Sequence, residues 1–123
     1  MAGTLTISTL SDGTNSTSAT NCIKGSAKAW VNFNGTGTVA IRASYNVSSI
    51  TDNGTGNYTV NFTNAMPDAN FVAVFGGSRN SPPTTGVGSC AFYAGTTTTQ
   101  RLITCNSDFS AVDFEIAMVS IFN

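Results

Sequence analysis

The strongest constraint on the fold is a two-residue alternation of apolar and polar side chains that recurs between residues 28 and 75. Residues 29–33 and 58–62 both alternate in this way, and Asn-Gly pairs follow the first run and precede the second. Successive side chains of a strand point to opposite faces of a sheet, and Asn-Gly is typical of tight hairpin turns. The pattern therefore predicts antiparallel β-hairpins with one buried face.

The whole chain is expected to be all-β, because no segment carries a helical apolar spacing over ten or more residues. We predict an antiparallel β-sandwich, jelly-roll-like, of about eight short strands. A length of 123 residues suits a single domain. We expect an N-terminal strand and polar connector over residues 1–25, with the strand at 4–9 and a loop at 11–21, and the sandwich over residues 26–123.

Four further expectations concern particular strands. The return strand of the first hairpin is expected to place Val39, Ile41, Ala43 and Tyr45 on one face. The run Phe71 to Phe75 is apolar on both faces, which is typical of a central strand covered on both sides. Residues 76–88, with Pro82 and Pro83, predict an exposed loop. In the last strand, Val112, Phe114, Ile116 and Met118 share one face, but Val119 and Ile121 share the other with Asp113 and Glu115, which predicts a bulge, a switch of the buried face, or an oligomer that covers both faces.

The charge pattern excludes several classes of partner. Charged residues make up 9% of the chain, against about 25% in an average soluble domain. The net charge is −1, so no basic surface is expected for nucleic acid. Membrane insertion is not expected either, because no run approaches the roughly 20 apolar residues that a span requires. The N-terminal residues do not resemble a secretory signal, so we expect synthesis in a cytoplasm without export.

The sequence predicts no catalytic residue, no metal site and no cofactor. Histidine is absent, which removes the usual base for a nucleophile. Asp113 and Glu115 are interpreted as surface charges rather than as a catalytic pair. Cys90 and Cys105 are expected to face each other across a third hairpin, between residues 90–94 and 102–105, either as a disulfide or as two small buried thiols.

Candidate binding residues are neutral, aromatic or basic. Trp30 points away from the predicted buried face of its strand, so it is a candidate either for stacking on a sugar ring or for packing in the core or a subunit interface. Arg79 and Asn80 fall in the predicted 76–88 loop, and Tyr93 and Arg101 fall in the following hairpin. Because recognition often lies on loops of a rigid scaffold, these four residues are the other candidates for contact with a receptor.

The segment Lys28 to Phe75, which begins KAWVNFNGTGTVAIRASYNVSS, resembles a segment of bacteriophage tail-fibre and other virion-associated proteins. It covers about two fifths of the chain. The resemblance implies a β-structured, homotrimeric appendage of the virion whose tip engages the host surface, through a glycan or an outer-membrane protein. It implies no particular binding residue, because the receptor-contacting loops of such proteins vary.

Three functions are compatible with this resemblance and with the composition. The first is a tail-fibre head domain that binds a host receptor by multivalent trimeric display. The second is a capsid decoration or cement protein that binds other virion proteins and stabilises the head. The third, a polysaccharide depolymerase, has the least support because the chain is poor in acid and base residues.

Overall fold

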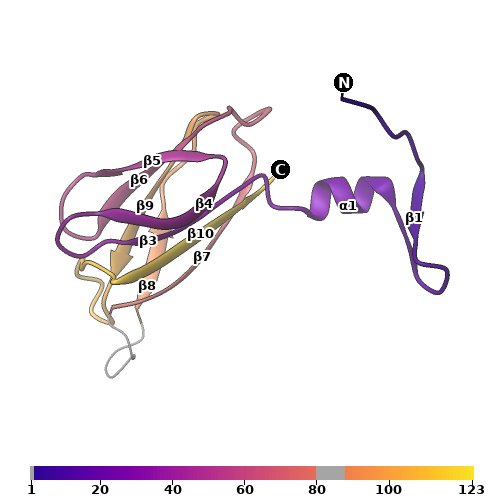
Figure 1. Ribbon diagram of the computed structural model, residues 1–123. Coiled ribbons are helices and arrows are strands. Elements are labelled where there is room, and N and C mark those ends of the chain that lie inside the picture. Colours follow the sequence, from indigo (N-terminus) through magenta and orange to yellow (C-terminus); the bar gives the residue numbers. More distant parts are fainter. Residues whose placement is uncertain (1, 80–87) are drawn as a thin grey trace.

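The computed structural model describes residues 2–79 and 88–123, and its main body consists of two packed antiparallel sheets (Figure 1). Its elements in chain order are β1 (Thr9–Ser11), β2 (Ser16–Ser18), α1 (Ala19–Gly25), β3 (Ala29–Asn34), β4 (Ala40–Tyr45), β5 (Val47–Asp52), β6 (Asn57–Phe62), β7 (Val72–Ser78), β8 (Ser89–Phe92), β9 (Thr99–Cys105) and β10 (Ile116–Phe122). One sheet has the order β4-β3-β10-β7 and the other β5-β6-β9-β8. The predicted antiparallel β-sandwich of about eight strands is confirmed.

The chain passes from one sheet to the other at Asn46, the single residue between β4 and β5. Asn46 has a φ of +53°, a left-handed conformation that asparagine tolerates better than most residues. Its Nδ2 donates to the Lys28 carbonyl at 3.1 Å, and its Oδ1 accepts from the Asn64 backbone N–H at 2.8 Å. These contacts fix the crossing, so each of the two predicted hairpins, β3–β4 and β5–β6, stays within its own sheet.

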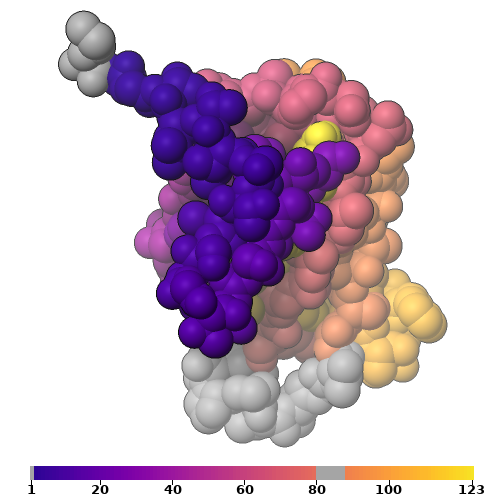
Figure 2. All heavy atoms as spheres, turned by 90° about the vertical axis from the view of Figure 1, so that its right-hand side faces the viewer, coloured from indigo at the N-terminus to yellow at the C-terminus, as the bar shows by residue number. Residues whose placement is uncertain are grey.

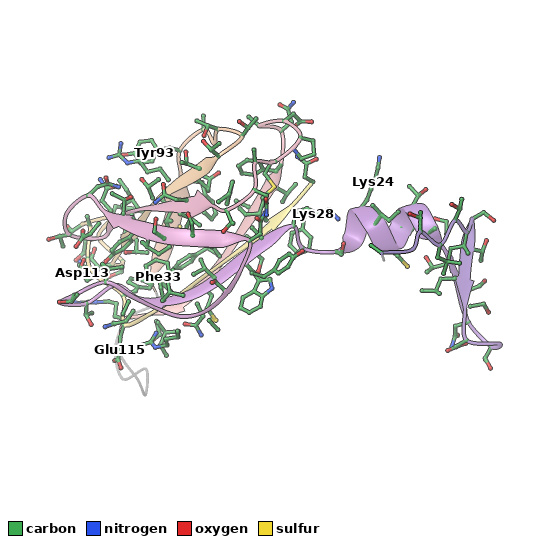
Figure 3. The ribbon with its side chains drawn as sticks, turned by 45° about the horizontal axis from the view of Figure 1, so that its top comes forward. Lys24, Lys28, Phe33, Tyr93, Asp113 and Glu115 are labelled. Atoms are coloured by element: carbon green, nitrogen blue, oxygen red, sulfur yellow. The ribbon has the colours of Figure 1, made fainter. Side chains whose placement is uncertain are left out.

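The core lies between the sheets and is formed by the inward side chains of both. Phe33 from β3 lies inside the sandwich (Figure 3). Phe33 and Tyr58 from β6 are fully buried and meet edge to face, with ring centroids 5.2 Å apart. Edge-to-face packing of aromatic rings adds about 0.5–1.5 kcal/mol beyond the burial of area. The predicted inward faces of the runs 29–33 and 58–62 are confirmed, because every inward side chain is buried: Ala29, Val31, Phe33, Tyr58, Val60 and Phe62.

The buried face switches just before β10, one of the alternatives that the sequence left open. Phe114 is buried, and the next buried residue is Ala117, an odd number of positions further on. A bend at Glu115 lies between them. Met118 is therefore 42% exposed on the outer face, and the expectation that it shares a face with Phe114 is wrong.

Two predictions about edge strands are also wrong. β7 is an edge strand rather than a central one, and its outward Val72 and Val74 are 61% and 52% exposed. In β4, a register shift opposite Asn32 and Phe33 places Ile41 opposite Phe33 but Ala43 opposite Asn32. Phe33 and Asn32 point to opposite faces of the sheet, so Ile41 and Ala43 also point to opposite faces. The expectation that the apolar side chains of this strand share one face is therefore wrong.

Residues 2–25 form an N-terminal extension in which every residue is exposed except the half-buried Ala19. Its hairpin is β1–β2, where Asp12 Oδ1 accepts the backbone N–H groups of Thr14 and Asn15 at 2.9 and 2.7 Å. Ser18 then caps α1 by accepting the Asn21 N–H at 3.1 Å. The predicted strand at 4–9 and loop at 11–21 are wrong, because short side-chain hydrogen bonds rather than apolar alternation shape this segment.

The extension stands away from the sandwich on the side where the C-terminus also lies (Figure 1). Figure 2 views the molecule from this side, with the extension in indigo. The Lys28 ammonium donates to the Ile23 carbonyl in the last turn of α1 and to Ser26 Oγ. These two hydrogen bonds tie the end of the helix to the start of the sandwich. None of the described helical residues belongs to a helix long and apolar enough to cross a membrane.

Candidate functional site

The outer face of the β5-β6-β9-β8 sheet is covered by hydroxyl and amide groups, and we call it the polar face. Because the neighbouring residues of β6 and β9 point into the core, these side chains point outward. The polar and aromatic side chains of this face are Ser49, Thr51, Asn57, Thr59, Asn61, Tyr93, Thr99 and Arg101, and the apolar pair Ile103 and Ala91 lies on the same face beside Asn57. Such a surface offers many neutral donors and acceptors on a rigid support.

Side-chain hydrogen bonds order the polar face across its strands. The Asn61 amide donates to Ser49 Oγ at 3.0 Å and to Thr51 Oγ1 at 2.9 Å, both on the neighbouring β5. Asn53, in the turn before β6, donates to Thr59 Oγ1 at 2.9 Å. These bonds fix the rotamers of the amides and hydroxyls, so a ligand would meet groups that are already ordered.

Arg101 and Tyr93 form the one basic and aromatic cluster among strands β5, β6, β8 and β9 and the residue that follows β8. The Arg101 guanidinium lies over the Tyr93 ring, with its carbon 4.5 Å from the ring centroid. Arg101 Nε donates to Asn57 Oδ1 at 3.0 Å. The guanidinium is thereby held flat, and such a fork can bind a carboxylate, a phosphate or sugar hydroxyls.

The sequence named five candidate receptor contacts, and the structure brings two of them together. Tyr93 and Arg101 are neighbours on the polar face, and Figure 3 shows Tyr93 at its outer side. Arg79 is exposed at the end of β7, where its carbonyl accepts the Glu115 N–H at 3.3 Å. Asn80 lies outside the described residues. Trp30 belongs to the other sheet.

Trp30 points outward as expected, and it lies on the apolar face, our name for an exposed group on the β4-β3-β10-β7 sheet. This group consists of Trp30, Tyr45, Val72, Val74 and Met118. Trp30 pairs with Tyr45 on one side and with Ser120 on the other, and Ser120 pairs with Val74. The two outer faces of the sandwich thus differ in chemistry, one polar and the other apolar.

The sequence did not predict that the side chains of Ser49, Thr51, Asn57 and Asn61 take part in hydrogen bonds on one face of the sheet. A signal was present, because polar residues alternate with the core residues of β6. Alternation alone predicts only a solvated face, however. It does not reveal which amides reach which hydroxyls on the next strand, because that depends on the register of β5 against β6.

Asp113 is not a free surface charge, as the sequence suggested, but a structural link at the end of the sandwich away from the extension (Figure 3). Its Oδ1 accepts the Gly56 backbone N–H and the Tyr58 hydroxyl, each at 2.7 Å. The same hydroxyl lies 2.9 Å from the Gly35 carbonyl, which also accepts from it. Burial, followed by the hydrogen bond to Asp113, raises the pKa of Tyr58 well above its usual range.

The predicted cross-strand pair of cysteines is one residue out of register. Ser89 lies opposite Cys105, and Cys90 lies opposite Thr104, so the two thiols do not face each other. Both cysteines are free thiols, and both are half-buried rather than fully buried as the second alternative expected. Burial, with a smaller contribution from Cys105, raises the pKa of Cys90 to about 12.

These two pKa values predict a loss of stability in alkali. Cys90 and Tyr58 hold their protons more tightly when folded than when unfolded, so above about pH 9 the unfolded state releases protons first and is favoured. We expect the free energy of unfolding in urea, measured under reducing conditions, to be constant near neutral pH and to fall from about pH 9 upward. Between pH 9 and 10 the free energy of unfolding of the Cys90→Ala variant should fall less steeply than that of the unaltered chain. Equal slopes in the two proteins would contradict a raised pKa of the Cys90 thiol.

Among residues 2–79 and 88–123, no three His, Cys, Asp or Glu side chains gather as they would to hold a metal ion. No family model, no curated protein and no solved structure matches the chain. The features of the chain that bear on function are therefore the chemistry of its two outer faces and the resemblance of residues 28–75 to tail-fibre proteins.

Proposed function

We propose that this chain is the head domain of a phage tail fibre and that its polar face binds a receptor on the host surface. The observation that carries the proposal is the Arg101, Tyr93 and Asn57 cluster, held among ordered amide and hydroxyl groups. Saccharides present many hydroxyl groups, often with scattered carboxylates or phosphates. A neutral donor-and-acceptor surface with one oriented guanidinium fits such a ligand.

The proposed mode of action is binding rather than catalysis. Asp113, one half of the only carboxylate pair that the sequence offered, is engaged by Gly56 and Tyr58 inside the fold. A homotrimer, which the resemblance implies, would display three polar faces on one particle. Weak individual sites then gain avidity when linked, by a factor of about 10² to 10⁴ when the geometry permits.

Binding to cells tests this proposal. The purified protein is expected to bind intact host bacteria, and Arg101→Ala should lower that binding at least about tenfold, because the loss at each site is multiplied by avidity. Tyr93→Ala should act in the same direction, because it removes the ring that holds the guanidinium flat. Arg42→Ala is the matched control: it removes the same charge from exposed β4 in the other sheet, and it should leave cell binding unchanged.

A second candidate, a capsid decoration protein, is favoured by the apolar face and by the exposed apolar residues of the extension. Both are suited to docking on another virion protein. In a parallel assay with capsids that lack the chain, binding to capsids and not to cells would favour decoration. Release of reducing sugar from host polysaccharide would instead indicate a depolymerase.

A further inference from the structure

Two apolar surfaces of this chain have no partner within the described residues. One is the apolar face, whose members are between 39% and 61% exposed. The other is the N-terminal extension, where Leu5, Ile7, Leu10 and Ile23 are all at least 40% exposed and α1 buries no residue. An exposed apolar surface of this kind usually marks a site of association.

The extension contains an apolar hollow, and the apolar face carries large aromatic side chains. The extension encloses a hollow of about 350 Å³ between its N-terminal segment and α1, lined by Leu5, Thr6, Ile7, Leu10, Ala19, Cys22 and Ile23. The lining carries no charged side chain. The apolar face presents the large side chains of Trp30 and Tyr45, which could enter such a hollow. A charged neighbour of this face is Arg42, which donates to Asn32 Oδ1 at 3.4 Å beside Met118.

We propose that the N-terminal extension of one copy docks on the apolar face of a second copy of this chain. The occupant is another copy because the same chain supplies both exposed apolar halves of the contact, a hollow on the extension and large aromatic side chains on the sheet. The Lys28 ammonium donates to the Ile23 carbonyl of α1, and the helix points away from its own sandwich (Figure 1), where a second copy can reach it. The contact joins two different surfaces, and head-to-tail contacts of this type close into a ring when the rotation permits.

This inference does not depend on the proposed receptor. The apolar face makes the contact between copies, and the polar face stays exposed to solvent on every copy. Trp30, for which the sequence left sugar stacking and an interface open, is thereby assigned to the interface. Avidity at the polar face would follow from the ring, but the contact itself can be tested without any host.

The test uses full-length chains that carry one new carboxylate each. Val74→Asp damages the apolar face, Leu5→Asp damages the extension in a segment without regular structure, and Thr51→Asp places the same charge on the polar face as a control. Sedimentation equilibrium of the unaltered chain should show association at micromolar concentration. Val74→Asp and Leu5→Asp should each weaken it at least about tenfold, or ~1.4 kcal/mol, and Thr51→Asp should not.

Mixing the two damaged chains gives the decisive result. The intact extension of the Val74→Asp chain can dock on the intact face of the Leu5→Asp chain, so we expect mixed dimers that neither protein forms alone. Circular dichroism of each variant establishes that the sandwich is folded. A monomeric unaltered chain, association unaffected by both variants, or no recovery on mixing would overturn the inference.

Discussion

Replacing Gly56 with alanine is expected to lower the free energy of unfolding by about 3 kcal/mol, combining left-handed strain of ~1–2 kcal/mol with overpacking of ~1–3 kcal/mol. Gly56 has a φ of +64° and is buried. It lies against the backbone of Thr104 in β9 and of Val112 in the segment before β10. A Cβ at this position would lie 2.6 Å from the Thr104 carbonyl oxygen and 2.7 Å from the Val112 nitrogen. Both neighbours are backbone atoms, which cannot move aside as the end of a side chain can.

Gly37→Ala is the matched control for this substitution. Gly37 has nearly the same φ, +62°, but an added Cβ there would meet nothing within 4 Å. We expect a loss of only ~1–2 kcal/mol, the part due to the left-handed conformation. Urea unfolding of both variants measures the difference, and equal losses would show that the packing around Gly56 is looser than described.

Replacing Asp113 with alanine is expected to lower the free energy of unfolding by about 2–3 kcal/mol, because hydrogen bonds to a charged group contribute more than neutral ones. The change leaves the buried Gly56 N–H without its acceptor, and Tyr58 keeps only the Gly35 carbonyl. The same urea titration measures this loss. Asp113→Asn should recover part of it, because the amide oxygen can still accept both hydrogen bonds, although without the charge that strengthens them.

Asp108→Ala serves as the control for charge. It removes the same negative charge from an exposed turn, so it should change stability by less than about 0.5 kcal/mol. If Asp113→Ala were as mild as Asp108→Ala, Asp113 would be an ordinary surface charge, as the sequence suggested.

The sandwich could be predicted from the sequence because its hairpins are encoded locally. The alternation in residues 29–33 and 58–62 sets the inward faces of β3 and β6, and a turn of four residues joins β5 to β6. Even so, the positive φ in the first turn falls at Gly37 rather than at Gly35. Gly35 is required for another reason, since an added Cβ would lie 2.5 Å from the Tyr58 hydroxyl.

Other features depend on contacts between distant residues, which a single sequence does not display. The role of Asp113 arises from partners more than fifty positions away, at Gly56 and Tyr58. The spacing of Cys90 and Cys105 suggested a symmetric hairpin, and a one-residue difference in register separated them. The pairing of Arg101 with Tyr93 and Asn57 likewise depends on how β9 lies between β6 and β8.

The prediction that β7 is a central strand was wrong, although the strand has apolar side chains on both faces. This pattern is typical of a strand that is covered on both sides, but within a single copy of the chain only the inner face of β7 is covered. If a second copy covers the apolar face, the pattern of β7 has a physical explanation in the assembly. The sequence would then carry information about the oligomer that the single chain does not satisfy.

The most direct test of the proposed function is the position of the chain on the phage particle. Antibodies raised against the purified protein and labelled with gold can be located on intact particles by electron microscopy. We expect the label at the distal end of the tail, where the polar faces can meet the host. Label distributed over the capsid would contradict host attachment and favour decoration, and particles without label would contradict both virion functions.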